Sequence, residues 1–127
     1  MIYLDSCLVI YAIEPNGTAS ERVLAAIADA DATFAVSPLV LMECLVGPLR
    51  AERTSVAETY EAFCSSVEMI PLGLDVFRRA AELRATTSLR TPDALHLAAA
   101  DLGGCSALWT NDHRFAAVGE FVVNVLS

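Results

Sequence analysis

The sequence contains no lysine. Its basic side chains are eight arginines and two histidines, against sixteen acidic residues, and the formal net charge is −8. This balance excludes proteins that hold nucleic acid by bulk positive charge, because that mode of binding needs a basic surface. It leaves open the binding of phosphate through divalent cations, which reverse the local sign of charge. An acidic surface also suits a basic protein partner.

Long apolar runs and targeting signals are missing as well. The segment that comes nearest to a membrane span, residues 34–46, is too short and contains Glu43. No basic segment precedes an apolar stretch at the N-terminus, where Asp5 comes early, so we expect no signal peptide. These features predict a cytoplasmic protein that makes no membrane contact.

Paired cysteines are absent too, since none of the four forms a C-x-x-C motif. Structural zinc sites depend on such pairs, so we expect none here. Each cysteine lies in or beside an apolar segment and is interpreted as a small buried hydrophobic side chain. The four are Cys7, Cys44, Cys64 and Cys105.

What the chain has in abundance is apolar residues, which make up 55% of its 127 positions and give a mean hydropathy of +0.51. The length predicts a single domain over residues 1–127 with a sizeable core. A domain of this size cannot bury so much apolar surface by itself. We therefore expect a homodimer, a complex with a partner chain, or both.

Short apolar, β-prone segments alternate along the chain with segments of helical periodicity. This order predicts an α/β fold with a central, mostly parallel sheet that helices cover on both faces. The expected strands are 1–4, 33–36, 67–70, 107–110 and 121–125. The expected helices are 7–12, 21–30, 39–46, 49–64, 75–86 and 92–102, with a short helical or turn segment at 113–118.

Hydroxyl residues and prolines mark the expected helix boundaries. Ser6 and Ser20 are expected to be N-caps of the first two helices. In Ser37–Pro38 and Thr91–Pro92, the hydroxyl residue suits the N-cap and the proline suits the first helical position. Gly47–Pro48 predicts a break or kink in the helix that contains it.

Four acidic residues fall at corresponding places in this fold. Asp5 and Asp112 follow apolar strands, and Asp93 lies in the first turn of a helix, where a carboxylate also favours the helix dipole. Glu43 lies about a turn and a half into the helix after the second strand. Sites in such sheets form outside the carboxyl ends of the strands, so all four can converge there.

Glu43 is the most informative of the four, because the residues one helical turn away from it are apolar or glycine. A carboxylate buried without a partner costs several kcal/mol or becomes protonated. Glu43 is therefore protonated, reaches solvent past Gly47, or shares a cation with the other acids. Oxygen-only ligation favours magnesium or manganese over zinc.

Phosphodiester hydrolysis is the chemistry that such a cluster suits. One or two metal ions, about 4 Å apart when paired, lower the pKa of a bound water and neutralise charge on the phosphate. Asp5 and Asp93 are expected to be the principal ligands. Glu43 and Asp112 are expected to complete the coordination or to orient the attacking water.

Three further residues beside these acids have both a functional and a structural interpretation. Ser6 either donates a hydrogen bond to Asp5 or only caps a helix. Thr110 and Asn111 either hold a metal-bound water or satisfy the turn after their strand.

The nearby basic residues are equally open. Arg90 is either a phosphate contact or a surface side chain. His96 lies on the same helix face as Asp93 and either touches the site or packs in the core, the latter being the simpler interpretation. His113 and Arg114 are expected only near the rim.

Four fragments of the sequence, taken together, resemble PIN-domain ribonucleases of the VapC toxin type. They are Ile2-Tyr3-Leu4-Asp5-Ser6, Ser37-Pro38-Leu39-Val40-Leu41-Met42-Glu43, Arg90-Thr91-Pro92-Asp93-Ala94-Leu95-His96-Leu97-Ala98 and Thr110-Asn111-Asp112-His113-Arg114-Phe115. They occur in the family's order and span nearly the whole chain, and the family's acidic positions map onto Asp5, Glu43, Asp93 and Asp112.

This resemblance implies a PIN-like three-layer α/β/α sandwich and a magnesium- or manganese-dependent endoribonuclease, the toxin of a type II toxin–antitoxin system. It also implies a cognate VapB-like antitoxin that blocks the site, a homodimer and a toxin–antitoxin hetero-oligomer. Contact with DNA is then expected only through the antitoxin.

Two alternatives stay open at this point. One is a non-catalytic module of the same fold that acts by binding a partner or RNA. The other is a metal-dependent phosphatase or DNA nuclease. A phosphatase with a nucleophilic aspartate would usually have a second acid two residues after Asp5, where this chain has Cys7.

Overall fold

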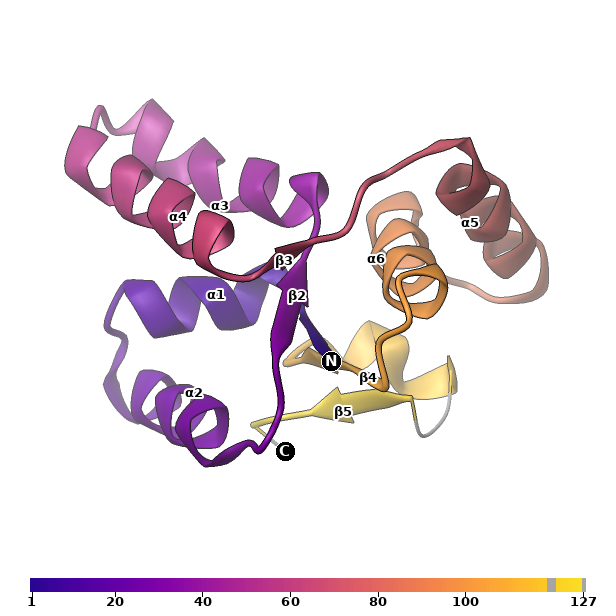
Figure 1. Ribbon diagram of the computed structural model, residues 1–127, viewed down its shortest axis with the longest axis horizontal. Helices are drawn as coiled ribbons and strands as arrows, with labels where there is room; N and C mark the ends of the chain where they lie inside the picture. The colour runs from indigo at the N-terminus through magenta and orange to yellow at the C-terminus, as the bar shows by residue number, and fades with distance from the viewer. Residues whose placement is uncertain (119–120, 127) are drawn as a thin grey trace.

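The computed structural model describes residues 1–118 and 121–126 (Figure 1). Its strands are β1 (Ile2–Leu4), β2 (Phe34–Val36), β3 (Glu68–Met69), β4 (Ala107–Thr110) and β5 (Val122–Asn124). Its helices are α1 (Ser6–Ile13), α2 (Gly17–Asp29), α3 (Pro38–Arg50), α4 (Thr54–Ser66), α5 (Leu74–Thr86), α6 (Thr91–Leu102) and the 3₁₀ helix η1 (His113–Val118). Within these ranges, no helix is both long and apolar enough to cross a bilayer.

The strands form one sheet in the order β3-β2-β1-β4-β5, and every neighbouring pair is parallel. Helices α1 to α4 lie on one side of the sheet, and α5 and α6 lie on the other (Figure 1). The prediction of a helix-covered, mostly parallel sheet is thus confirmed, and the architecture is a three-layer α/β/α sandwich. Because all strands run the same way, the residues that follow them share one edge.

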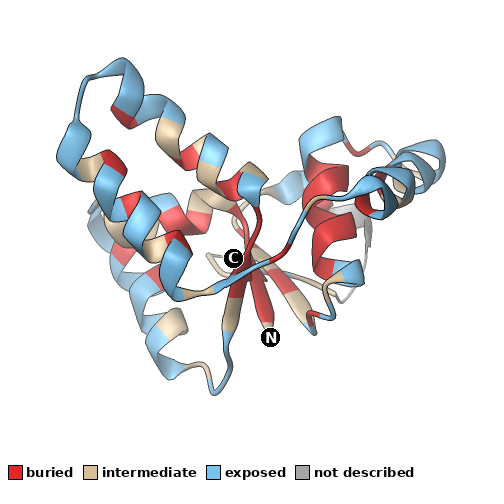
Figure 2. Cartoon of the chain, turned by 45° about the horizontal axis from the view of Figure 1, so that its top comes forward, coloured by how far each residue is buried: buried red, intermediate tan, exposed pale blue. Residues whose placement is uncertain are grey.

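The centre of the core lies on β1 and α6 (Figure 2). All three residues of β1 are buried, since β1 is the middle strand and has helices on both faces. Helix α6 is buried continuously over residues 93–100, where it packs between the sheet and α5. Its alanines, Ala94 and residues 98–100, allow this close packing. As a result, Asp93 and His96 are held inside the protein.

Two predicted N-caps are wrong by one to several residues. Helix α1 is capped by Asp5, whose side chain accepts a hydrogen bond from the Ser6 N–H, and Ser6 is the first helical residue. Helix α2 begins at Gly17, and Ser20 lies inside it, where its hydroxyl accepts the N–H of Asn16. Both prediction errors follow from the same fact: several cap-type residues lie close together there, and spacing alone does not choose among them.

The two proline-containing helix starts follow the prediction only in part. Ser37 is the N-cap of α3, but its side chain makes no capping bond and turns to Tyr3 instead. Arg90, and not Thr91, is the N-cap of α6. Thr91 is already helical, and its hydroxyl accepts a hydrogen bond from Arg84 Nη1 at 3.0 Å.

The predicted break at Gly47–Pro48 is also misplaced. Helix α3 continues through Pro48 to Arg50, and the chain turns at Glu52, which has a positive φ of 55°. Helix α4 accordingly starts at Thr54, five residues later than predicted. Pro48 lacks the N–H that would bond the Cys44 carbonyl, but this loss falls in the last turn, where the helix tolerates it.

Candidate active site

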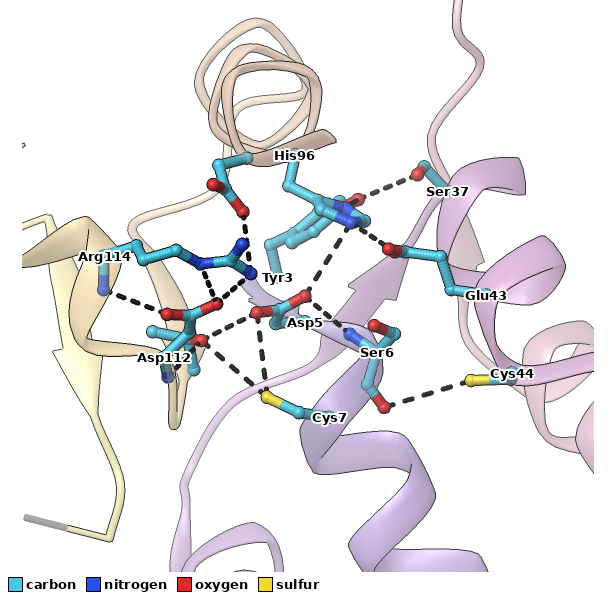
Figure 3. A network of polar contacts seen from close by, with 12 residues as sticks. Tyr3, Asp5, Ser6, Cys7, Ser37, Glu43, Cys44, His96, Asp112 and Arg114 are labelled. Carbon is cyan, nitrogen blue, oxygen red and sulfur yellow. Dashed lines mark hydrogen bonds and ion pairs between the residues drawn. The ribbon is translucent and has the colours of Figure 1, made fainter. Parts of the chain in front are cut away.

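The four predicted acidic residues gather at the carboxyl edge of the sheet: Asp5, Glu43 and Asp112 lie together in Figure 3, and Asp93 joins them through its ion pair with Arg114. Asp5 follows β1, and Asp112 follows β4 by two residues. Glu43 lies in the second turn of α3, and Asp93 lies in the first turn of α6. Both helices begin at this edge because they run antiparallel to the strands they cover.

Asp5 is fixed in place by the residues around it and is only 7% exposed. Its Oδ1 accepts the Ser6 N–H at 2.8 Å, and its Oδ2 accepts the Thr110 hydroxyl at 2.7 Å. The Cys7 thiol lies 3.7 Å from the same Oδ2. These bonds hold both carboxylate oxygens in one orientation.

Glu43 is paired with His96, from the opposite side of the sheet. Oε1 of Glu43 lies 2.6 Å from His96 Nε2, and the Glu43 side chain stays 30% exposed. The His96 side chain is 2% exposed, and its Nδ1 lies 2.7 Å from the Tyr3 hydroxyl. Of the interpretations of His96 left open by the sequence, the structure supports contact with the site.

Asp93 has the least satisfied carboxyl group of the site. It is 4% exposed, and its Oδ2 is buried without a hydrogen-bond partner in the described residues. Its Oδ1 lies 3.5 Å from Arg114 Nη2. Burial raises the pKa of Asp93 above its usual range, and the nearby Arg114 partly opposes that rise.

Asp112 is held by the same arginine. Its Oδ2 accepts hydrogen bonds from Arg114 Nη2 and, at 2.7 Å, from Arg114 Nε, while its Oδ1 accepts the Arg114 backbone N–H at 2.9 Å. The Arg114 side chain lowers the pKa of Asp112 below its usual range. The guanidinium thus bridges Asp112 and Asp93.

The weaker candidate residues separate into two groups. Ser6 and Thr110 contact Asp5 directly. Arg90 is exposed at the start of α6, and Asn111 lies in the bend after β4, where it lines a pocket of about 430 Å³ with Cys7 and five residues of 10–16. Among the described residues, neither side chain hydrogen-bonds to the four acids, whose partners include Ser6, Thr110, His96 and Arg114.

Sequence reasoning gave too little weight to His96 and Arg114. The signal for His96 was its position one helical turn after Asp93, on the same face of α6. The signal for Arg114 was its position two residues after Asp112, which allows a local carboxylate–guanidinium pair. Neither spacing reveals the second partner of each residue, Glu43 or Asp93, because those partners come from other elements.

The donor set fits a divalent metal ion. Carboxylate oxygens are the ligands that magnesium and manganese prefer, and Asp5 and Glu43 offer such oxygens within 4.8 Å of each other and of a ring nitrogen of His96. The buried, unpartnered Oδ2 of Asp93 is a further oxygen that needs a cation or a hydrogen-bond donor. The residues at this edge of the sheet therefore have both the chemistry and the unmet charge that such an ion would satisfy.

The sequence matches the model of the PIN-domain family over residues 2–121. No curated protein sequence matches it significantly.

Solved structures with a closely similar fold include a toxin–antitoxin complex from Klebsiella pneumoniae, with a TM-score of 0.83, 23% identity and 98% of each chain covered. Mycobacterium tuberculosis VapC20, described as a toxin that cleaves the sarcin–ricin loop, has a TM-score of 0.82 at 19% identity, again over 98% of each chain. Rickettsia felis VapBC2, bound to a DNA fragment from its promoter, has a TM-score of 0.72 at 22% identity, over 97% of this chain and 96% of that chain. At such identities the likeness establishes the shared fold.

Proposed function

This chain belongs to the PIN-domain family, and from that premise we propose that it is the toxin of a type II toxin–antitoxin system, a VapC-type endoribonuclease that depends on magnesium or manganese. The observation that carries the proposal is the cluster of Asp5, Glu43, Asp93 and Asp112 at one edge of the sheet. Two of these carboxyl groups are buried, and Asp93 Oδ2 has no partner among the described residues.

The four acidic residues have two proposed roles in hydrolysis. Asp5 and Asp93 are the principal metal ligands, and Glu43 and Asp112 complete the coordination or orient the attacking water. A divalent ion bound there would supply charge neutralisation on the phosphate and lower the pKa of a water molecule. Thr110 and Ser6 keep Asp5 in its ligating orientation through their hydrogen bonds to it. Arg90 and Asn111 are the proposed contacts of the RNA backbone.

The proposed partners follow from the surface and from the structural relatives. A net charge of −8 suits a basic segment of a VapB-like antitoxin at the acidic site. Large apolar side chains stay exposed on the described surface, including Leu49 at 64% and Leu74 at 66%, as expected for a homodimer or a toxin–antitoxin hetero-oligomer. RNA is the proposed substrate, and VapC20 is the structural relative described as cleaving the sarcin–ricin loop. DNA contact would come only through the antitoxin.

Cleavage of end-labelled total RNA by purified, partner-free protein tests the proposal. We expect discrete fragments with magnesium or manganese, none with EDTA, and none from the Asp93→Asn variant under either metal. A folded protein that binds metal but cuts no RNA would instead support a non-catalytic module that acts by binding RNA or a partner. Preferential cleavage of DNA or of phosphomonoesters would favour the nuclease or phosphatase alternative. Fragments that persist in Asp93→Asn would contradict the assignment of the site.

A further inference from the structure

We propose that His96 is a positioning residue that fixes the Glu43 carboxylate, and that Tyr3 and Ser37 extend this support into the core. The inference rests on the proposed function, because Glu43 is taken to face the metal and the attacking water. It assigns a role to three residues, none of which is itself expected to touch the substrate.

The four side chains form one continuous chain of hydrogen bonds (Figure 3). Ser37 Oγ lies 2.7 Å from the Tyr3 hydroxyl, which lies 2.7 Å from His96 Nδ1. His96 Nε2 then lies 2.6 Å from Glu43 Oε1. Ser37 and Tyr3 are fully buried and His96 nearly so, whereas Glu43 is half-buried at the open end.

The direction of the last bond follows from the chemistry of its partners. An ionised carboxylate only accepts hydrogen bonds, so His96 Nε2 carries the proton and donates it to Glu43. With a neutral imidazole, Nδ1 then accepts from Tyr3, and Tyr3 accepts from Ser37. Every donor in this arrangement therefore points towards Glu43.

This geometry argues against His96 as a direct metal ligand. Its Nε2 is already bonded to Glu43, and its Nδ1 is bonded to Tyr3 on the side away from the carboxylates. Asp5 Oδ1 is 3.7 Å from Nε2, which is too long for a hydrogen bond. His96 thus lies behind Glu43 in the way that outer partners orient the ligands of metal sites.

The geometry also argues against His96 as a mere packing residue. A residue that only fills space in the core needs the right volume and no particular orientation. The His96 ring is instead held by two hydrogen bonds of 2.6 and 2.7 Å, which fix its plane and its tilt. The bond to Glu43 engages Oε1 and leaves Oε2 for a second partner on the open side. Loss of the His96 donor would free the glutamate to rotate towards solvent, since 30% of its side chain is exposed.

Four variants test the proposal. His96→Leu removes the donor, whereas His96→Gln keeps an amide N–H close to the place of Nε2. Tyr3→Phe breaks the chain one step further back. Tyr60→Phe is the matched control, because Tyr60 is also fully buried but its hydroxyl bonds Glu14 away from the site. The readouts are the Mn²⁺ dissociation constant by calorimetry, the thermal midpoint, and pulsed electron paramagnetic resonance of bound Mn²⁺.

We expect His96→Leu to weaken Mn²⁺ binding about tenfold, as outer-shell losses do at other sites. His96→Gln should retain most of the affinity, Tyr3→Phe should fall between the two, and Tyr60→Phe should match the wild type. The resonance spectra should contain no imidazole nitrogen coupling that depends on His96.

Equal Mn²⁺ affinity in the wild type, His96→Leu and Tyr3→Phe would overturn the inference. A nitrogen coupling that disappears in His96→Gln would overturn it too, by making His96 a ligand. If His96→Leu does not fold, the order of His96→Gln and Tyr3→Phe relative to the Tyr60→Phe control decides. Failure of the wild type to cut RNA, with this pattern of Mn²⁺ affinities intact, would count against the proposed function and not against the positioning role.

Discussion

The Thr110 hydroxyl donates a hydrogen bond of 2.7 Å to Oδ2 of Asp5, a residue 105 positions away in the sequence. The Thr110 hydroxyl oxygen in turn accepts the backbone N–H of Asp112 at 3.0 Å. A single fully buried hydroxyl thus links the acid after β1 to the loop that carries the acid after β4. Because strands β1 and β4 are neighbours in the sheet, this link sets how far apart the two carboxylates lie.

Thr110→Val should therefore lower both stability and metal affinity. The valine has the same shape but leaves the Asp112 N–H and one Asp5 oxygen without their partner, which costs about 1–3 kcal/mol. We expect a lower thermal midpoint in differential scanning fluorimetry and weaker Mn²⁺ binding. Thr110→Ser, which keeps the hydroxyl, is the control and should stay close to the wild type. A valine variant as stable as the serine variant would show that the hydroxyl does not hold this loop.

Asp93→Asn should make the protein more stable at neutral pH while removing its metal site. Burial raises the pKa of Asp93 in the folded state, so the ionised carboxylate opposes folding above that pKa. The neutral amide avoids this cost, and we expect the melting temperature to rise by about 4 °C, which corresponds to ~1 kcal/mol in a chain of this size.

The sign of the pH dependence provides an internal check on that gain. As the pH falls through the raised pKa of Asp93, this carboxylate becomes protonated in the wild type, and the cost of burying its charge disappears. The gain of Asp93→Asn should therefore be largest at pH 7–8 and shrink in acid. Melting curves of both proteins, recorded from pH 8 down into the acid range, measure this difference in melting temperature. A difference that grows in acid would contradict the interpretation.

Arg114→Ala should strengthen the binding of divalent metal. In the structure the guanidinium pairs with both Asp112 and Asp93 and lowers the pKa of Asp112. A bound metal ion would compete with this cation for the same carboxylates. We expect about a fivefold lower Mn²⁺ dissociation constant, the size of one partly exposed ion pair. Arg79→Ala, which breaks ion pairs with Glu82 and Asp101 on the helix surface, should leave Mn²⁺ binding unchanged. Weaker binding in Arg114→Ala would mean that the arginine supports the site.

The cysteines should be unreactive in the folded protein, although Cys7 lies beside Asp5 in the candidate active site. Three of the four are buried, and Cys7 is half-buried. Burial, with the negative charge of Asp5, raises the pKa of the Cys7 thiol to about 12, so little thiolate exists at pH 8. A thiol titration with Ellman's reagent should find slow reaction in buffer and four fast thiols in guanidinium chloride. One fast thiol in the native protein would contradict this account of Cys7.

Much of the fold could be predicted from local pattern, because the period of apolar residues identifies strands and helices whatever they pack against. All five strands fall within the predicted segments, and the alternation of strands and helices along the chain correctly predicted the parallel sheet. Helix boundaries were less secure. Ser20 and Thr91 have the chemistry of a cap, but their hydroxyls accept hydrogen bonds from Asn16 and Arg84 instead. The choice depended on which donor came within reach once the chain had folded.

The sequence by itself determined that Asp5, Glu43, Asp93 and Asp112 would meet at one sheet edge, because the direction of parallel strands assigns their carboxyl ends to the same side. Only the tertiary structure decided what each carboxylate touches. Glu43 meets His96 across 53 residues and Asp5 meets Thr110 across 105, while Asp93 is left with a buried oxygen that no described residue satisfies. The physical reason is range: periodicity and strand direction act over a few residues, whereas a hydrogen bond of 2.6–2.7 Å depends on how whole elements pack and on the rotamers that this packing allows.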